Sequence, residues 1–477
     1  MTEHATFDAF LRATFGDELE AFLNHAPAPD FIRVNPLRAS VERVLTALEA
    51  YDIEVESHPA DPLIFKVVRH PPNIPVGTVL QHFMGWFRVQ SLGSMVPPLV
   101  LGPRPGEKVL DLCSAPGSKT TQMGAQMEGR GELWVNELSG RRMNQLSAGI
   151  DSAGLFNAIA TRSDGARLAS IVDDEFDRVL ADVPCTGLGT RDNLGANRAR
   201  FEATGRSSRM ANIQYPLSVG ATRLVRLGGR IVYSTCSLTL EENEEVLTRV
   251  LERYPLRVLP MDNIPGLHMR PGYTAHDTRQ FHPDMALARR IVPWENPSDG
   301  FFVALLERTD ELPSRHRRPE AGVAPRVPTV AWDHEDVHHG VLTAMETYGI
   351  PQHRFEAARY RRHKDKVYRL SADIESYWVD AFRTGISMLR RRGRHWRLTH
   401  TAVQHFADDI SRNVAWIDDD AFRVLVSTSA CPLPGDAHLT TPYPVIAHAA
   451  FGPFAIGAVD DGQLLWQVPR RYELPGA

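Results

Sequence analysis

Short, mostly apolar runs alternate with longer helix-like stretches between about residues 109 and 306. The runs lie at residues 109–112, 133–136, 157–161, 176–181, 229–234 and 300–306. Runs of this kind are typical of strands that are buried on both faces of a parallel sheet. The pattern therefore predicts an α/β domain whose sheet forms the centre of the chain.

The N-terminal region has a different pattern. Residues 1 to about 30 carry apolar side chains at helical spacing, a short strand follows at 30–34, and a helix begins near Ser40. Two strand-like runs, at 53–56 and 63–68, come next, and a helix ends near Pro103. We expect a small α+β lobe with exposed arginines. The lobe could present a sheet to RNA, and a subdomain that merely caps the main fold is an equal alternative.

The composition changes again after residue 306. Residues 308–330 hold four prolines and five arginines, which predicts an extended linker. A helix at 336–348 ends at Gly349, and an Asp-Gly turn at 461–462 predicts a β-hairpin near the C-terminus. We expect four segments: an N-terminal lobe (1–103), an α/β domain (104–308), a linker (309–331) and a mostly-β module (332–477).

Composition and charge limit the class of protein. The 477 residues are 43% hydrophobic and 23% charged, as in globular proteins of two or three domains. No apolar run approaches the about 18 residues of a membrane span, and the N-terminus has no signal-peptide pattern. We therefore expect a cytoplasmic protein. The four cysteines have no regular spacing, so neither a zinc site nor a disulfide framework is expected.

The net charge of −5 argues against a general polyanion binder, but the charge is unevenly distributed. Residues 359–397 contain twelve Lys or Arg and four acidic residues. Such a stretch is either a solvated helix face or a surface that binds nucleic acid.

The turn after the first predicted strand is the first candidate site. It contains small residues before a helix, so a ligand can approach the backbone closely. A P-loop would need Gly-Lys-Ser/Thr, and a dinucleotide fingerprint would need three glycines, whereas this turn has only Gly117. The pattern favours an adenosine-type cofactor without a pyrophosphate, and an ordinary βα turn without a ligand remains the alternative.

Acidic residues occur at the ends of the first four predicted strands. They are Asp111, Glu137, Asp164 and Asp182. Carboxylates along one sheet edge can accept hydrogen bonds from a ribose, an adenine amino group and a cationic amino-acid tail. Glu137 occupies the position that binds ribose in adenosine-cofactor folds.

Two cysteines follow neighbouring strands of the predicted sheet. Cys185 comes three residues after Asp182, and Cys236 follows the fifth strand. A free cysteine is most often a small buried hydrophobe. Here both cysteines have polar, proline or glycine neighbours, which favours side chains that face the ligand cleft.

These motifs together resemble the Sun-domain (Nop/Sun) family of RNA cytosine-C5 methyltransferases. The matching segments are 111–120, 182–187 with Gly189, 233–238 with 241–243, and also 33–37, 89–91 and 299–304. The resemblance covers about residues 7–307, with Leu188 and Cys113 as departures from the usual residues. It implies a Rossmann-like methyltransferase domain that uses S-adenosylmethionine. The C-terminal module is similar to the PUA-like RNA-binding modules of some members.

The resemblance also implies the roles of single residues. Carbon 5 of cytosine becomes nucleophilic only after a thiolate has added to carbon 6. The family's nucleophile corresponds to Cys236, Cys185 would help to break the covalent adduct, and Lys119 and Asp182 would hold the base. The implied cofactor residues are Cys113, Ser114, Ala115, Pro116, Gly117, Ser118, Lys119, Glu137, Asp164 and Asp182.

We therefore expect an RNA (cytosine-5) methyltransferase that acts on rRNA or tRNA as a monomer, without metal or membrane. Extruding a paired base costs a few kcal/mol, so a single-stranded or loop target is favoured. Two alternatives are a DNA cytosine methyltransferase and a non-catalytic RNA-binding or ribosome assembly factor.

Overall fold

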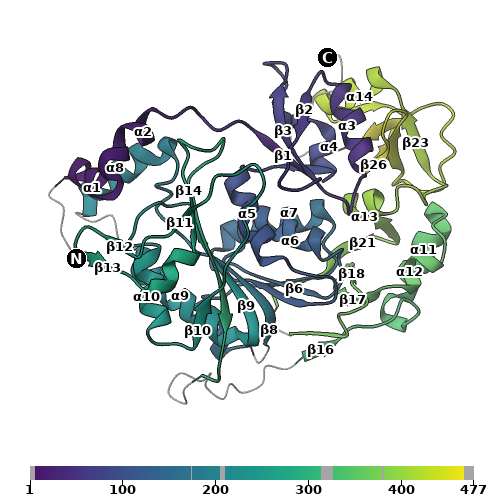
Figure 1. Cartoon of the computed structure of the whole chain (residues 1–477). Coiled ribbons are helices and arrows are strands. Elements are labelled where there is room, and N and C mark those ends of the chain that lie inside the picture. The colour runs from purple at the N-terminus through teal and green to yellow at the C-terminus, as the bar shows by residue number, and fades with distance from the viewer. Residues whose placement is uncertain (1–5, 173–174, 205–209, 313–325, 379–380, 467–477) are drawn as a thin grey trace.

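A mixed β-sheet forms the centre of the protein (Figure 1). The computed structural model describes residues 6–172, 175–204, 210–312, 326–378 and 381–466. The strands follow the order β11 (Arg270–Pro271), β14 (Arg289–Ile291), β15 (Phe301–Arg308), β9 (Val225–Thr235), β8 (Phe176–Asp182), β5 (Lys108–Asp111), β6 (Glu132–Asn136), β7 (Ala158–Thr161) and β20 (Arg383–Thr384), and β10 (Leu256–Val258) pairs with β15. The strands β5 to β9 are parallel, whereas β15 is antiparallel to β9. All six predicted strands are present.

Helices cover both faces of this sheet. They are α5 (Leu92–Leu101), α6 (Ser118–Gln126) and α7 (Gly140–Ala153) on one face, and α9 (Met210–Leu224) and α10 (Glu244–Leu251) on the other. Neighbouring residues of one strand enter different cores, since Val109 packs with the first group and Leu110 with the second. Burial on both faces explains why the strands appear as apolar runs.

The N-terminal helices lie against the α/β domain. The sequence predicted one helix, but Gly16, with φ +54°, separates α1 (Phe7–Phe15) from a 3-10 turn and α2 (Leu19–Asn24). Their buried apolar side chains pack against Phe201 of α8 (Leu194–Thr204), and the Phe10 and Phe201 ring centroids are 6.1 Å apart. Figure 1 shows α1 beside α8.

The lobe that follows contains a small antiparallel sheet. Its strand order is β2 (Glu54–Ser57), β3 (Ile64–Arg69), β1 (Phe31–Val34) and β4 (Phe87–Val89), with the helices α3 (Val41–Glu49) and α4 (Leu80–Phe83). Ser40 caps α3 by accepting a hydrogen bond from the Arg43 amide. The predicted strands and helix of this lobe are therefore present.

The C-terminal part contains helices as well as strands. It forms the sheet β17 (Arg359–His363), β18 (Lys366–Leu370), β21 (Ile386–Arg392) and β22 (His395–Leu398), the sheet β23 (Val414–Ile417), β25 (Val445–His448) and β26 (Gly452–Ile456), and the sheet β24 (Ala430–Pro432), β28 (Gln463–Leu465) and β27 (Ala458–Asp460). Its helices are α11 (Glu335–Tyr348), α12 (His353–Glu356), α13 (His400–His405) and α14 (Asp419–Thr428). Most of the basic stretch 359–397 thus lies in strands and not on a helix.

The predicted linker falls partly outside the described residues, which omit 313–325. Near the end of the predicted linker, β16 (Arg326–Pro328) pairs with β19 (Ser376–Trp378). The predicted hairpin is present as β27 and β28, with Asp461 and Gly462 both at positive φ. The remaining short strands are β12 (Ala275–His276) and β13 (Arg279–Gln280).

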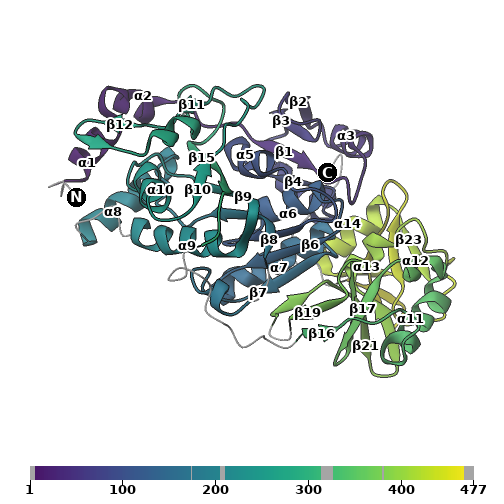
Figure 2. The same cartoon turned by 60° about the horizontal axis from the view of Figure 1, so that its bottom comes forward.

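The C-terminal part is joined to the rest of the protein through packed contacts. β20 extends the central sheet by pairing with β7, and Arg383 forms an ion pair with Asp151 of α7. One hydrophobic core combines residues of the N-terminal lobe with residues of the C-terminal sheets; for example, the Phe83 and Trp466 rings are 6.3 Å apart. Figure 2 shows this side-by-side arrangement from another direction.

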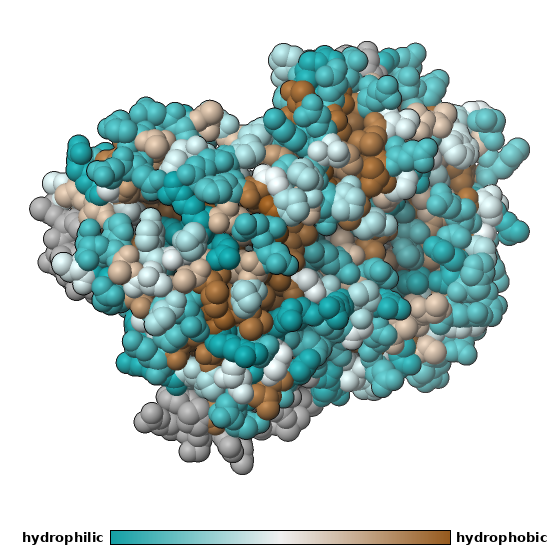
Figure 3. Space-filling model, viewed as in Figure 1, coloured by the Kyte–Doolittle hydropathy of each residue, from teal (hydrophilic) through white to brown (hydrophobic). Residues whose placement is uncertain are grey.

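The surface is largely hydrophilic at its periphery. On the face shown in Figure 3, hydrophobic residues gather in the middle and near the junction of the N-terminal lobe with the C-terminal elements. Among the described residues, no helix combines the length and the apolar composition that crossing a bilayer requires.

Candidate active site

Two cysteines meet at the carboxyl ends of neighbouring strands. β8 ends at Asp182 and β9 at Thr235, and Asp182 is in register with Ser234. The loops that follow bring the Cys185 and Cys236 sulfur atoms to 3.0 Å from each other. Both thiols are free and half-buried. The structure thus brings together two residues that are far apart in the sequence.

The two thiols have opposite pKa shifts. The hydrogen bond from Cys185 lowers the pKa of Cys236, and the positive charge of Lys119 acts in the same direction. The same hydrogen bond, together with burial, raises the pKa of Cys185 well above its ordinary value. Cys236 is therefore the thiol that more readily forms the thiolate, while Cys185 keeps its proton.

A lysine and a carboxylate lie beside the cysteines. Lys119, in the first turn of α6, has its Nζ 2.9 Å from Asp182 Oδ2, and the Ser234 hydroxyl donates to Asp182 Oδ1 at 2.7 Å. The Lys119 Nζ also lies 4.9 Å from the centroid of the Phe301 ring. These contacts fix both side chains next to the sulfur atoms, so a donor and an acceptor are available to the edge of a base.

A buried glutamate ties the two cysteine loops together, and our sequence interpretation assigned it no role. Glu242 is 1% exposed and accepts five hydrogen bonds. Their donors are the Thr186 amide and hydroxyl, the Ser237 and Thr239 hydroxyls and the Gln214 amide group. Thr186 follows Cys185 and Ser237 follows Cys236, so one carboxylate positions both loops. The only sequence signal was its place in the segment 241–243.

A cleft of about 270 Å³ lies at the same edge of the sheet, next to the cysteines, and Pro184 forms part of its wall. The predicted residues Cys113, Glu137 and Asp164 line it, together with the apolar residues Leu138 and Ile213, which the sequence did not indicate. Leu138 is 64% exposed and Ile213 47%, so both present apolar surface to the solvent. Two carboxylates and apolar walls suit a flat polar ring with an attached sugar.

The remaining predicted residues of the turn lie beside this cleft rather than in its wall. Ser114 and Ala115 are each 5% exposed, and the Ser114 hydroxyl donates to the Asp111 carbonyl. Gly117 has φ +108° and precedes α6, where a Cβ atom would lie 3.1 Å from Leu146. Pro116 and Ser118 complete the turn. The turn is a tight backbone connection that brings the start of α6 to the sheet edge.

The four predicted carboxylates do not act as one ring. Glu137 is 4% exposed, accepts from the Ser139 amide at 2.7 Å and lies 3.4 Å from Arg142. Asp164 is half-exposed and accepts from a backbone amide of its own turn. Glu137 and Asp164 therefore line the cleft, whereas Asp182 lies beside the cysteines.

Asp111 differs from the other three predicted carboxylates because it is buried and does not line the cleft. Asp111 is 1% exposed, and its Oδ2 accepts a hydrogen bond from the Thr120 hydroxyl at 2.6 Å. Burial raises the pKa of Asp111 to about 7. Its other oxygen, Oδ1, is buried without a hydrogen-bond partner among the described residues, and the charges of Asp182 and Lys119 act on the carboxyl group. Burial likewise raises the pKa of the neighbouring Cys113 thiol.

In the part of the chain that the structure describes, no group of three or more His, Cys, Asp or Glu side chains is placed to hold a metal ion.

Comparisons with known proteins show which proteins the chain is similar to. A family profile described as "16S rRNA methyltransferase RsmB/F" matches residues 98–307. The chain is 30% identical over 408 residues to the "Ribosomal RNA small subunit methyltransferase F" of Erwinia tasmaniensis, covering 83% of this chain and 81% of that protein. It is 33% identical over 298 residues to the "25S rRNA (cytosine-C(5))-methyltransferase nop2" of Schizosaccharomyces pombe, covering 61% of this chain. The chain spans 48% of the length of that yeast relative.

A solved structure shares the fold. The crystal structure of a methyltransferase homolog protein from Pyrococcus horikoshii superposes with a TM-score of 0.54 at 26% sequence identity. The superposition covers 63% of this chain and 94% of the archaeal protein.

Proposed function

Because the chain belongs to the RsmB/F family of rRNA methyltransferases, we propose that it transfers a methyl group from S-adenosylmethionine to carbon 5 of a cytosine in rRNA. The family membership confirms the resemblance to Sun-domain enzymes. The observation that carries the proposal is the 3.0 Å contact between Cys185 and Cys236, which have opposite pKa shifts.

The reaction begins at Cys236. Its thiolate adds to carbon 6 of the cytosine, which makes carbon 5 nucleophilic. Lys119 and Asp182, joined by their 2.9 Å ion pair, hold the polar edge of the base beside the sulfur. S-adenosylmethionine supplies the methyl group as an electrophile. The bond between carbon 5 and the methyl group would form as the bond between the methyl group and the cofactor sulfur breaks, which would leave S-adenosylhomocysteine, and carbon 5 would still carry its proton.

Cys185 completes the cycle. The hydrogen bond with Cys236 is the largest cause of its raised pKa. The Cys236 sulfur loses its negative charge when it is bound to carbon 6. The hydrogen bond that raised the pKa of Cys185 is then lost, so the pKa of Cys185 falls and its proton becomes easier to release. Once its own proton has passed to solvent, the Cys185 thiolate takes the carbon-5 proton, the electron pair of that C–H bond restores the double bond between carbons 5 and 6, the bond between sulfur and carbon 6 breaks, and the Cys236 thiolate returns.

The cleft beside the cysteines supports the assignment of the cofactor. Glu137 would accept hydrogen bonds from the ribose hydroxyls, and Asp164 would lie at the adenine. The exposed apolar side chains of Leu138 and Ile213 would cover the faces of the ring. Arg142 contacts both Glu137 and the Ala115 carbonyl, so it links the ribose end of the cleft to the turn 113–119, which would line the amino-acid end.

The flanking parts of the chain would hold the RNA. We assign RNA recognition to residues 1–103 and 332–477, catalysis to 104–308 and the connection to 309–331, in a cytoplasmic monomer whose C-terminal module is PUA-like. The turns after β17 and β21 lie at the same end of one sheet, since Lys366 is in register with Arg390. This end exposes Arg362, Lys364, Arg391, Arg392 and Arg394. Such a basic tip suits the phosphate backbone.

Cysteine variants test the function directly. Purified protein is mixed with rRNA and S-adenosylmethionine that carries a labelled methyl group. Cys236→Ala should transfer no label, because the nucleophile is lost. Cys185→Ala should run with RNA as a slow-migrating adduct on a denaturing gel, and the double variant should not. Cys431→Ala is the matched control, because this thiol is buried in β24 of the C-terminal part.

The outcomes distinguish the alternatives. Activity that survives in Cys236→Ala and is lost only in Cys185→Ala would assign the nucleophile of DNA methyltransferases. If Cys185→Ala turns over normally without an adduct, Cys185 only fills space. A wild-type protein that transfers no label to any RNA would contradict the proposal.

A further inference from the structure

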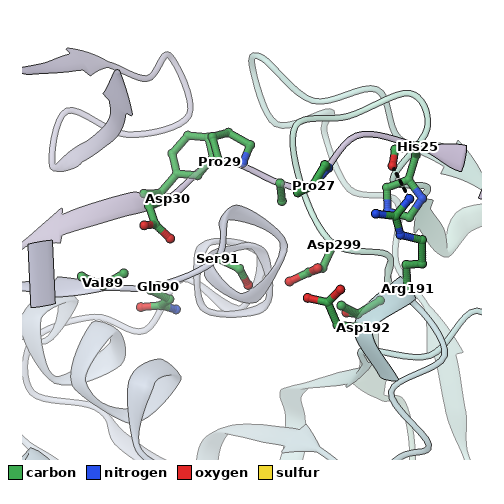
Figure 4. Close-up of a pocket in the computed structure, with 13 residues that line it drawn as sticks. His25, Pro27, Pro29, Asp30, Val89, Gln90, Ser91, Arg191, Asp192 and Asp299 are labelled. Carbon is green, nitrogen blue, oxygen red and sulfur yellow. Dashed lines mark hydrogen bonds between the residues drawn. The ribbon is translucent and has the colours of Figure 1, made fainter. Parts of the chain in front are cut away.

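A second cavity, of about 250 Å³, lies between the N-terminal connector and the catalytic loops (Figure 4). Its walls come from His25 and residues 27–31, which lead from α2 into β1, from residues 89–91 between the end of β4 and α5, from residues 190–192, and from Asp299. None of the residues assigned above to the cofactor or to the reaction lines it. Its volume is below the range of about 300–1,000 Å³ that is usual for drug-sized ligands, so it suits a single small ring system.

Backbone contacts join this cavity to the reacting cysteine. The Gly189 amide donates to the Cys236 carbonyl at 2.9 Å, and the Gly300 amide donates to the Gly189 carbonyl at 2.8 Å. A Cβ atom on Gly189 would lie 2.2 Å from the Gly300 carbonyl oxygen, so only glycine fits there. Thr190, which follows Gly189, and Asp299, which precedes Gly300, line the cavity. The cavity is therefore within reach of a nucleotide next to the one held at Cys236.

The walls of the cavity are held in place before any ligand binds. The Arg191 guanidinium donates to the Leu23 and His25 carbonyls, which fixes the connector against the loop 190–192. The Gln90 side chain accepts from Arg33 and donates to Gln122. A preformed site loses little conformational entropy when it binds.

The lining has the two kinds of surface that a nucleobase needs. The rings of Pro27 and Pro29 offer apolar faces, whereas Asp30, Asp192 and Asp299 bring three carboxyl groups. Figure 4 shows Asp192 and Asp299 directed toward one another beside Ser91. Burial raises the pKa of Asp299, and Asp192 adds to the rise. Carboxylates repel a phosphate but accept hydrogen bonds from N–H groups. N–H donors between Asp192 and Asp299 would also reduce the repulsion between these two carboxylates.

We propose that this cavity binds the base of a nucleotide adjacent to the target cytosine and selects guanine. This inference depends on the proposed function, because it takes RNA as the substrate. Guanine presents an N–H and an amino group side by side on its Watson–Crick edge, which matches paired carboxylate oxygens. Adenine and cytosine place an acceptor nitrogen next to their amino group, and uracil flanks its N–H with two carbonyl oxygens, so each would turn an acceptor toward a carboxylate.

A pool of randomised RNAs tests the proposal and requires no defined target sequence. Each RNA carries one loop cytosine between random neighbours, and bisulfite sequencing after reaction reads the neighbours of methylated cytosines. Wild type should enrich guanine about tenfold over uracil at one neighbouring position. Asp192→Asn should lose this enrichment, and Asp299→Asn provides a second variant if the first does not fold. Asp262→Asn, an exposed carboxylate outside the cavity, should keep it.

A binding selection separates this inference from the proposed reaction. The same pool is bound to the Cys236→Ala protein, which needs no methyl transfer, and the bound RNAs are sequenced. Guanine should again be enriched, and replacing it with inosine, which lacks the amino group, should weaken binding about tenfold. If bound RNAs show no guanine preference, or if Asp192→Asn and Asp299→Asn keep the wild-type preference, the inference is wrong. If binding shows the preference but wild type methylates nothing, only the reaction is refuted.

Discussion

Replacing Glu242 with glutamine should impair catalysis more than its distance from the sulfur atoms suggests. The carboxylate of Glu242 accepts hydrogen bonds from residues adjacent to both cysteines, and from Gln214, which also donates to the Pro184 carbonyl. Glutamine has almost the same shape but turns an amide group toward donors. At least one donor then loses its acceptor inside the protein.

The magnitude follows from which donors each oxygen of Glu242 accepts. The Thr186 amide and the Gln214 amide group both donate to Oε2, so glutamine keeps them when its oxygen takes that position. Its amide group then replaces Oε1, which accepts from the Thr186, Ser237 and Thr239 hydroxyls. These hydroxyls lie 3.1 and 3.2 Å apart in two pairs, so at most two of their three hydrogens can turn to one another. One buried donor without an acceptor costs about 1–3 kcal/mol, so the free energy of unfolding should fall by about that amount. A shift of the cysteine loops by a fraction of an ångström should lower kcat by about 10- to 100-fold.

The pH dependence of kcat/KM in Glu242→Gln distinguishes a changed cysteine pKa from a loss of stability, because lower stability alone would not shift it. The negative charge of Glu242 raises the pKa of Cys236. Without that charge the pKa of Cys236 falls, so the thiolate forms at lower pH. The acidic limb of the kcat/KM profile should therefore move to lower pH in Glu242→Gln while the plateau falls. KM for S-adenosylmethionine should stay unchanged, because Glu242 does not line the cofactor cleft.

Glu241→Gln is the matched control. The Glu241 carboxylate is paired with Arg279 at 2.6 Å, away from the cysteine loops, so this variant should keep the wild-type kcat and acidic limb. The reasoning is refuted if Glu242→Gln has the wild-type kcat, or if both variants lose activity equally without a shift of the limb.

Three further changes should act on separate parts of the site. Glu137→Ala should weaken S-adenosylmethionine binding, measured by calorimetry, by roughly 1–3 kcal/mol, because hydrogen bonds to a charged acceptor are lost. Unchanged binding would show that Glu137 is not part of the cofactor site. Lys119→Gln removes a charge that lowers the pKa of Cys236, so alkylation of that thiol should require higher pH, and an unshifted alkylation profile would contradict this. Replacing Arg391 and Arg392 with alanine should reduce the slope of the logarithm of the RNA-binding constant against the logarithm of the salt concentration by about two. An unchanged slope would show that the basic tip does not contact RNA phosphates.

Local patterns in the sequence were sufficient for the six main strands of the α/β domain, for β1 to β3 of the N-terminal lobe and for the β27–β28 hairpin, but not for β17 to β26 of the C-terminal part. Apolar runs predicted strands because each of those strands is covered on both faces, and Ser40 and Gly349 marked a helix start and a helix end through their own hydrogen bonds and backbone angles. The position of Cys185 and Cys236 after adjacent strands also followed from the chain, since the carboxyl ends of parallel strands share one edge of a sheet.

Only the tertiary structure decided how these groups differ chemically. Cys185 and Cys236 are 51 residues apart in the sequence, yet the hydrogen bond between them is the leading cause of both pKa shifts. Only the structure showed that Glu242 links their loops and that Asp111 is buried. The sequence also gave no sign that the N-terminal lobe and the C-terminal sheets share one hydrophobic core. Burial, charge and hydrogen-bond partners depend on groups that are distant along the chain, so local patterns do not specify them.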